Sequence, residues 1–501
     1  MPIIALNTLT PRTHWPLLLV LLVSLPFMII NLDSVPHIWF DEGLNLNASR
    51  VLATEGVYGL PDANGIRLAD PAIQTGPPVI MLAALYSTFG PNLTVMRLLF
   101  VLVSLGTMIA LYALAFRLYG RLAAFVLLLL LLVTPGEDTS NYIMISRQVL
   151  GEIPAILCIT LGLHVLLTPA QNWRTQILTG LCFGVAVTLK SQVLLVFSVT
   201  LFLWAVYRVY RKRDDWQRWL IIIGTMALVY GLDTLWRTGA AVQYDTVTLR
   251  EGIFIHILPF RALDNLREMG VLARLLLVFT ICGGLFWVRW RMPQTHPKGV
   301  RQAEIENLII LFALVWVLWF ALVSIGWRRY AFIGQTFTTI LVAYGVALVW
   351  EGWLKLPSTR WLYAGLAAAG VIVGLVIYTP RFANPMGDQF ARLVQYIQRE
   401  VPAEARIVTW EWPISYFTDQ NYLMPSTHAT NQITAAVFLG RDIGPSPFAP
   451  LEDCPDYVLV GSFDVDRLLM GSALAAAETP ALFNEGPYEL YRIPAENLLR
   501  A

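Results

Sequence analysis

The chain has 501 residues, of which 56% are hydrophobic and only 14% are charged, and its formal net charge is +1. Soluble domains carry about 25% charged residues, so this composition is typical of a membrane protein. No basic tail or basic domain indicates nucleic-acid binding, and the four cysteines form neither a disulfide framework nor a CxxC zinc pattern.

Long apolar runs follow one another through the first three quarters of the chain. A spanning helix needs roughly 20 apolar residues, and by this criterion the sequence predicts about eleven transmembrane helices. They are expected near residues 15–32, 93–116, 121–135, 152–168, 176–189, 191–208, 217–236, 271–288, 305–325, 329–350 and 361–378. The first run lacks a small-residue cleavage site, so we expect a retained helix rather than a signal peptide.

Lysine and arginine residues collect on one side of these predicted spans. The main clusters lie at 117–121, 208–218, 289–301 and 355–360. The positive-inside rule makes this side cytoplasmic. We therefore expect a multi-pass protein of the cell membrane, with a cytoplasmic N-terminus and an extracytoplasmic C-terminal domain.

The first outer loop, residues 33–92, combines charge with apolar surface. It opens on HIWFDEGLN (37–45), continues with the amphipathic stretch LNLNASRVLATEG (44–56), and ends with GPPVIMLAALYSTFG (76–90). The last stretch is too short to span comfortably and begins with two prolines after its glycine. We expect interfacial helices in this loop.

The composition changes after residue 378, where polar residues and prolines become frequent. DQFARLVQYIQREV (388–401) predicts an amphipathic helix, and ARIVTW, DYVLVG and YELYRI predict short strands. The fold class expected is thus a polytopic α-helical membrane protein with a small C-terminal α/β domain. The transmembrane domain would cover residues 1–378 and the extracytoplasmic domain residues 379–501.

Two acidic residues on the outer side are candidates for chemistry. Asp41 can cap the helix that follows it, and among its aromatic neighbours it can also serve as a general base; the two roles are compatible. Glu152 opens a predicted helix in YIMISRQVLGEIPAI. It is either an N-terminal helix charge or a site residue, with Arg147 as its expected partner.

Cations on the outer side oppose the positive-inside bias, so each needs a reason. Arg97 precedes a predicted helix, Lys190 lies at a helix tip, and Arg328, Arg329 and Tyr330 open a late helix. Arginine binds phosphate bidentately and lysine binds it as a point charge. The alternatives are snorkelling towards lipid headgroups or pairing with the outer acids.

No histidine pair has helix-face metal spacing, and no cofactor is required by the sequence. A divalent metal held by His37, Asp41 and His256 is an open alternative. Nothing in the chain is built to hold a nucleotide, so an activated donor on the outer face would be attached to a lipid. A polyprenyl-phosphate leaving group needs no general acid, and one base with cations around the phosphate would suffice.

Six motifs in order resemble the GT-C membrane glycosyltransferases, specifically the branch of protein O-mannosyltransferases and the lipid A aminoarabinose transferase. They are WFDEG, TGPPVIMLAALYSTFG, RLLFVLVSLGTMIALYALAFRLYG, GEIPAILC, LKSQVLLV and RRYAFIG. Each motif alone is weak, and the resemblance rests on their shared order over residues 15–350.

The resemblance implies an inverting sugar transfer from a polyprenyl-phosphate donor. Asp41 matches the catalytic acidic position and Glu152 a second acidic position. Three basic residues and a tyrosine fall where family members contact the lipid phosphate: Lys190, Arg328, Arg329 and Tyr330. The acidic-Lys-Pro sequence of the aminoarabinose transferases is replaced by residues 75–77, and the β-trefoil domain of the protein mannosyltransferases is missing.

The sequence therefore predicts a hexosyl or pentosyl transferase of the cell envelope whose acceptor, whether lipid, glycan or protein, is open. Asp41 and Glu152 are the predicted catalytic residues. The predicted substrate-binding residues are Glu42, Arg97, Arg147, Lys190, Arg328, Arg329 and Tyr330. For Glu42 a structural partner is also expected. The main alternative is a transporter or flippase of a lipid-linked sugar, which would need no base; an assembly protein is a second alternative.

Overall fold

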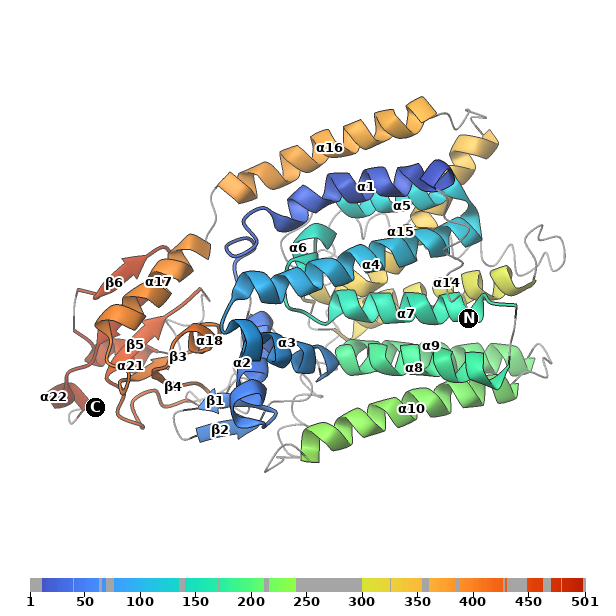
Figure 1. The fold of residues 1–501 in the computed structure, drawn as a ribbon. Coiled ribbons are helices and arrows are strands. Elements are labelled where there is room, and N and C mark those ends of the chain that lie inside the picture. The colour runs from blue at the N-terminus through green and yellow to red at the C-terminus, as the bar shows by residue number, and fades with distance from the viewer. Residues whose placement is uncertain are drawn as a thin grey trace.

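The computed structural model describes residues 11–38, 40–62, 65–68, 76–134, 140–169, 172–210, 216–239, 300–324, 326–353, 360–383, 387–426, 429, 448–462, 470–478 and 480–498. Within these ranges, a bundle of long helices carries a sheet-containing unit at one end (Figure 1).

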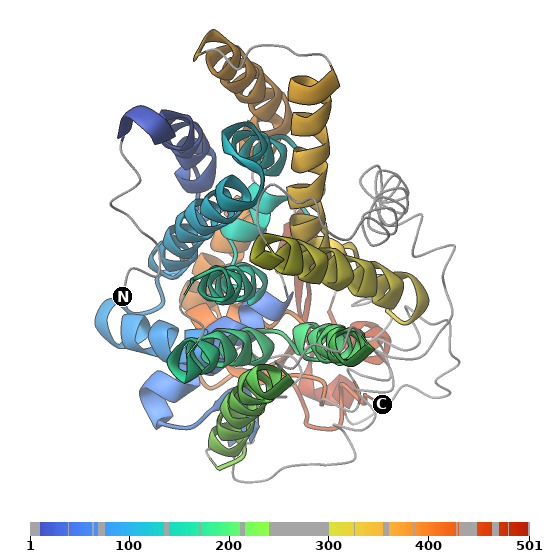
Figure 2. The same ribbon diagram turned by 90° about the vertical axis from the view of Figure 1, so that its right-hand side faces the viewer.

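The bundle helices run side by side, and Figure 2 shows many of them end-on. They are α1 (Pro11–Ile29), α4 (Leu93–Tyr119), α5 (Arg121–Val133), α7 (Glu152–Leu166), α8 (Trp173–Leu189), α9 (Ser191–Tyr210), α10 (Trp216–Gly239), α14 (Val300–Leu322), α15 (Arg328–Leu348) and α16 (Arg360–Ala383). A π-helical turn, η2 (Val349–Trp353), follows α15, and a short helix, α6 (Tyr142–Ser146), precedes α7.

Among the described residues, six helical stretches are long and apolar enough to cross a membrane: α4, α9, α10, α14, α15 and the stretch beginning at Trp361 that includes α16. Large apolar side chains such as Leu102, Phe202 and Leu235 are exposed on them, as expected where lipid is the solvent. The chain is a multi-pass membrane protein. The number of about eleven spans stays a prediction, and the span expected at 271–288 lies outside the described residues.

The first outer loop contains two helices, α2 (Phe40–Glu55) and α3 (Gly76–Phe89), where the sequence predicts interfacial helices. A small antiparallel hairpin of β1 (Gly59–Asp62) and β2 (Gly65–Leu68), which the sequence did not indicate, lies between them. Because α2 begins at Phe40, the acidic pair occupies its first turn, where the helix dipole favours carboxylates.

The C-terminal unit is built on a five-stranded sheet of order β4-β3-β5-β7-β6. The strands are β3 (Arg406–Thr409), β4 (Asn421–Leu423), β5 (Tyr457–Val460), β6 (Phe483–Glu485) and β7 (Tyr488–Arg492). β3 pairs in parallel with β4 and β5, whereas β7 is antiparallel to β5 and β6. Strands β3, β5 and β7 coincide with the three β-rich runs of the sequence.

Four helices accompany this sheet: α17 (Gly387–Glu400), α18 (Ile414–Phe417), α21 (Gly471–Ala476) and α22 (Ala495–Leu498). The amphipathic helix expected over residues 388–401 corresponds to α17. Its apolar residues Phe390, Leu393 and Ile397 are buried in the same apolar cluster as the sheet residues. The apolar core of this unit is therefore shared with α2 and α3 of the first loop.

Helix α2 joins this unit to the bundle through polar contacts with the segment that follows β3. Asn47 Nδ2 donates to the carbonyl of Trp412 at 2.7 Å. Arg50 donates to the carbonyl of Ser415 at 2.5 Å and forms an ion pair with Asp419 at 2.7 Å. The C-terminal unit is therefore fastened directly to the helix that carries the acidic pair.

Gly43 of α2 packs against Pro413 in this interface without room for a side chain, which generates a stability prediction. A Cβ on Gly43 would lie 2.7 Å from the Pro413 nitrogen and 2.8 Å from its Cδ. We expect Gly43→Ala to lower the free energy of unfolding by about 1–3 kcal/mol, since overpacking forces backbone shifts. Thermal unfolding of the detergent-purified protein measures this. Gly106→Ala is the matched control, because nothing lies within 4 Å of its added Cβ; equal melting temperatures for the two variants would contradict the prediction.

A buried carboxyl group also lies in the C-terminal unit, directly after β3. Glu411 Oε2 accepts hydrogen bonds from the backbone nitrogen of Ser462 at 2.8 Å and from its hydroxyl at 3.1 Å. Burial raises the pKa of Glu411 from 4.5 to about 7, and the two bonds from Ser462 oppose this rise only partly. The folded protein therefore holds a proton that the unfolded chain releases at lower pH.

This linkage predicts the direction of a pH effect on stability. Because the folded pKa of Glu411 lies above its unfolded value, its stabilising contribution is complete below about pH 4.5 and is lost as the pH rises through about 7. We expect the difference between the wild type and Glu411→Gln to change by up to about 3 kcal/mol over this range. Thermal unfolding of both proteins from pH 4.5 to 8 measures it, and parallel curves would contradict it.

Candidate active site

Four charged side chains from separate parts of the chain meet at the end of the bundle next to α2. Asp41 lies in the first turn of α2 and Glu152 is the first residue of α7. Lys190 ends α8, and Arg329 is the second residue of α15. All four were predicted site residues, and the structure brings them into one cluster.

In this cluster each cation contacts both carboxylates. A guanidinium nitrogen of Arg329 donates to Asp41, and its Nε lies 3.1 Å from Glu152 Oε1. The ammonium of Lys190 lies 2.9 Å from Glu152 Oε1 and 3.7 Å from Asp41 Oδ2. Two negative and two positive charges therefore alternate and cancel, which is what makes their burial tolerable.

The cluster is almost closed to solvent but not fully hydrogen-bonded. The side chains of Arg329 and Glu152 are 2% exposed, and those of Lys190 and Asp41 are 10% and 13% exposed. Although ion pairs surround them, both oxygens of Glu152 and the Nε and Nη1 of Arg329 lack an aligned hydrogen-bond partner. Such groups retain the capacity to bind an anion and a hydroxyl.

Arg328 and Tyr330 flank Arg329 at the start of α15. Arg328 is half-buried at the start of the helix. Tyr330 is buried and its ring packs against Trp319 and Trp327, with centroids 6.2 and 5.5 Å away. Arg329 forms ion pairs with both acids, and Tyr330 lies close enough to interact electrostatically with them.

Glu42 and Arg97 form a second, separate ion pair. Arg97 Nε and Nη2 donate to the two carboxylate oxygens of Glu42 at 2.8 and 2.7 Å, and Nη1 donates to the carbonyl of Leu32 at 2.9 Å. Both side chains are 0% exposed. The two adjacent acids of α2 thus have different partners, since one helical step turns Glu42 away from Asp41.

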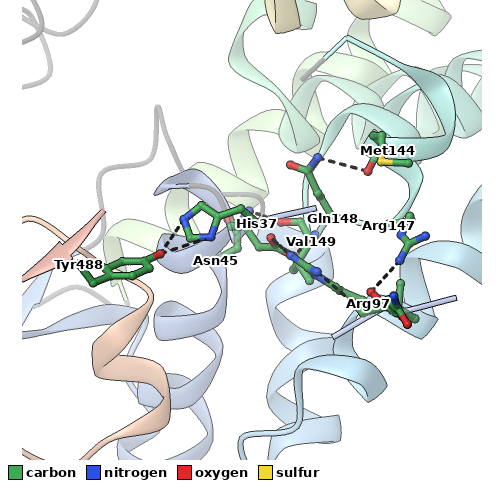
Figure 3. A network of polar contacts seen from close by, with 11 residues as sticks. His37, Asn45, Arg97, Met144, Arg147, Gln148, Val149 and Tyr488 are labelled. Carbon is green, nitrogen blue, oxygen red and sulfur yellow. Dashed lines mark hydrogen bonds and ion pairs between the residues drawn. The ribbon is translucent and has the colours of Figure 1, made fainter. Parts of the chain in front are cut away.

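Arg147 is bound by backbone carbonyls at the end of α1 and after it (Figure 3). Its guanidinium donates to the carbonyls of Phe27 and Asn31 at 2.7 and 2.8 Å and lies 5.0 Å from the ring centroid of Phe382. Glu152, for which Arg147 was the expected partner, is instead paired with Lys190 and Arg329.

The proposed ligands of a divalent metal are only partly described. His37 forms a hydrogen bond of 2.9 Å with the hydroxyl of Tyr488 in the C-terminal unit (Figure 3). Burial, and to a lesser degree the charge of Arg97, lowers the pKa of His37 to about 4. His256 lies outside the described residues, and among the described ones no three His, Cys, Asp or Glu side chains are grouped to hold a metal.

Sequence reasoning missed two residues that hold the backbone near the cluster. Asn45 Nδ2 donates to the carbonyl of Val149 at 2.8 Å, three residues before Glu152. Arg237 donates to the carbonyl of Thr188 at 2.9 Å, two residues before Lys190. A partner that is a backbone carbonyl leaves no mark in the sequence, and the only available signal was a polar side chain in an otherwise apolar surrounding.

Comparison with known proteins gives the class to which this architecture belongs. Residues 76–231 match the family model of dolichyl-phosphate-mannose-protein mannosyltransferase. The structure resembles ArnT from Cupriavidus metallidurans bound to undecaprenyl phosphate, with a TM-score of 0.64 and 14% identity over 97% of this chain and 99% of that one. No curated protein matches the sequence.

A second solved structure extends the likeness. The archaeal oligosaccharyltransferase AglB from Archaeoglobus fulgidus, in complex with an inhibitory peptide and a dolichol-phosphate, has a TM-score of 0.53 and 10% identity over 90% of this chain and 69% of that one. The resemblance that the six sequence motifs indicate is confirmed: this chain has the fold of the GT-C glycosyltransferase superfamily.

The contribution of the buried Glu42–Arg97 ion pair to the free energy of unfolding can be tested. Arg97→Leu would leave the carboxylate of Glu42 buried without its bidentate partner, so we expect a loss of about 3–5 kcal/mol in the free energy of unfolding. The double variant Glu42→Gln/Arg97→Leu removes the stranded charge and should recover part of this loss. Thermal unfolding of the two purified variants measures the effect; a double variant no more stable than Arg97→Leu would refute the explanation.

Proposed function

We propose that this protein is a membrane glycosyltransferase that moves a sugar from a polyprenyl-phosphate donor to an acceptor hydroxyl on the outer face of the membrane, with inversion. The observation that carries the proposal is the buried cluster of two carboxylates and two cations, in which donor and acceptor atoms remain unsatisfied. The match to a mannosyltransferase family model and the likeness to proteins solved with undecaprenyl phosphate and dolichol-phosphate support it.

Arg329 and Lys190 would bind the donor phosphate. Both cations contact Asp41 and Glu152 in the structure. A phosphate that enters the cluster offers them a stronger anionic partner with more acceptor oxygens, so it would take over part of their ion pairs. Arg328 and Tyr330, which flank Arg329 on α15, are proposed to complete the phosphate surroundings.

Asp41 would act as the general base. As the acceptor oxygen attacks the anomeric carbon, Asp41 takes the hydroxyl proton, and the bond between that carbon and the phosphate oxygen breaks with inversion. The electron pair of the broken bond stays on the polyprenyl phosphate, where Arg329 and Lys190 stabilise the added charge. Glu152 would hold the acceptor hydroxyl and keep the cations in place. The step needs no general acid.

The charge distribution supports an outer location of the cluster. Arg117 and Arg301 bind carbonyls just after the end of α7, the opposite end from Glu152: Arg117 donates to Leu167 at 3.1 Å, and Arg301 donates to Thr168 and Pro169 at 2.8 and 2.6 Å. Arg208, which pairs with Glu304, lies at the end of α9, whose start follows Lys190. The positive-inside rule makes that side cytoplasmic. The cluster and the C-terminal unit would then face outwards.

The decisive experiment is sugar transfer by the purified protein in nanodiscs, supplied with a panel of synthetic polyprenyl-phosphate sugars and envelope extract. Mass spectrometry of envelope glycans and glycolipids from a deletion strain would identify the missing sugar and its acceptor, which are then used in this assay. Transfer supports the proposal. Movement of the lipid-linked sugar across proteoliposomes without any transfer would instead support a flippase. The same assay with EDTA tests for a divalent ion.

The role of Asp41 predicts a selective loss. We expect Asp41→Asn to lower transfer at least about 100-fold, in line with removal of a general base. Binding of undecaprenyl phosphate should persist, because Lys190 and Arg329 remain. Asp33→Asn, which changes an exposed carboxylate of the same loop, is the matched control and should transfer normally. Transfer assays and lipid binding on the same preparations check both; full activity of Asp41→Asn would exclude it as the base.

A further inference from the structure

We propose that Asn45 is a positioning residue that, together with Glu42, sets the place of Glu152 relative to Asp41 by holding the backbone of Val149. This proposal rests on the proposed function above, in which the two carboxylates work on one acceptor. It assigns Glu42 to positioning rather than to substrate contact, because its two carboxylate oxygens are bound by Arg97 and by the backbone N–H of Val149.

The geometry is that of a two-point attachment to one residue. Glu42 Oε1 accepts the backbone N–H of Val149 at 3.0 Å, and Asn45 Nδ2 donates to the carbonyl of the same residue at 2.8 Å. Glu42 and Asn45 are three residues apart on α2, so they lie on the same face of the helix. Figure 3 shows Asn45 next to Val149. Bonds to both polar groups of Val149 fix its position and its orientation together.

A short, hydrogen-bonded stretch of chain carries this attachment to Glu152. Leu150 donates from its backbone to the carbonyl of Gln148 at 2.9 Å, and Ala155 donates to the carbonyl of Gly151 at 3.0 Å. Val149 and Glu152 are thus linked by two residues, Leu150 and Gly151, each of which takes part in a backbone hydrogen bond. Because Asp41 is covalently adjacent to Glu42, the same helical turn of α2 places one carboxylate and holds the other.

The attachment matters most when the donor is bound. In the structure the shared cations Arg329 and Lys190 also keep Asp41 and Glu152 together. A donor phosphate that takes over these cations would weaken that link. The separation of the two carboxylates would then depend on Val149 and its bonds to α2. Loss of Asn45 should therefore affect the reaction step more than phosphate binding.

Helix α2 offers a matched control on its opposite side. Asn47 is also a buried asparagine, and its side chain donates to the carbonyls of Gly43 and Trp412 at 3.0 and 2.7 Å. It ties α2 to the C-terminal unit but has no hydrogen bond to the stretch before Glu152. Asn45→Ala and Asn47→Ala thus remove the same group from the same helix with different partners.

The experiment compares these variants in full-length protein in nanodiscs. For Asn45→Ala we expect kcat to fall about 10- to 100-fold, since small misplacements of reacting groups cost this much. The dissociation constant for undecaprenyl phosphate should stay within about twofold, because Lys190 and Arg329 are unchanged. Hydrogen exchange should rise in residues 147–151. Asn47→Ala should keep both kcat and the protection of this stretch.

Asn45→Leu, which removes the donor at nearly constant volume, covers the case in which the alanine variant does not fold. A normal kcat in both Asn45 variants, or an equal loss in Asn47→Ala, would overturn the proposal. If the wild type transfers no sugar, the proposed function fails. Hydrogen exchange then still tests whether Asn45 holds the backbone of Val149. Unchanged protection of residues 147–151 in the folded Asn45 variants would overturn this attachment.

Discussion

Alternating ion pairs between Asp41, Arg329, Glu152 and Lys190 connect four helices that are distant in sequence. Isolated charges at such burial would be prohibitively unstable, so each of these side chains requires the others. The start of α7, the end of α8 and the start of α15 must therefore come to one place beside α2. The same requirement makes the cluster a poor source of net stability, because desolvation offsets most of the attraction. Its presence points to a use other than holding the fold together.

Helix α2 links the charged cluster to the rest of the molecule through side chains on its different faces. Its first turn presents Asp41 to the cluster and Glu42 to Arg97, and the next turns present Asn45 to Val149 and Arg50 to the C-terminal unit. A helix turns about 100° per residue, so neighbouring side chains serve different parts of the molecule without competing. The C-terminal unit thereby becomes part of the support of the site, although it contributes none of the four clustered charges.

The sequence could predict which charges matter but not all of their partners. Asp41, Glu152, Lys190 and Arg329 stand out because ionised groups are rare and costly next to apolar spans. Their grouping followed from the resemblance to a family rather than from spacing. The carbonyl partners of Arg147 were not predictable, since a backbone acceptor has no sequence signature. Long helices and strands β3, β5 and β7 followed from the sequence pattern, whereas β4 and β6 were not predicted and the β1–β2 hairpin lacks the alternation that marks a strand.

The charge balance of the cluster also explains how an anion could be bound in a nearly closed site. Lys190 and Arg329 are held in place by ion pairs with Asp41 and Glu152 while no substrate is present. An incoming phosphate meets cations that are already desolvated, so little solvent has to be reorganised on binding. Each ion pair given up to the phosphate frees carboxylate oxygen for an acceptor hydroxyl. Under the proposed function, donor binding would thus prepare the acceptor side of the same site, and the rigid attachment of both carboxylates to α2 would preserve its geometry during that exchange.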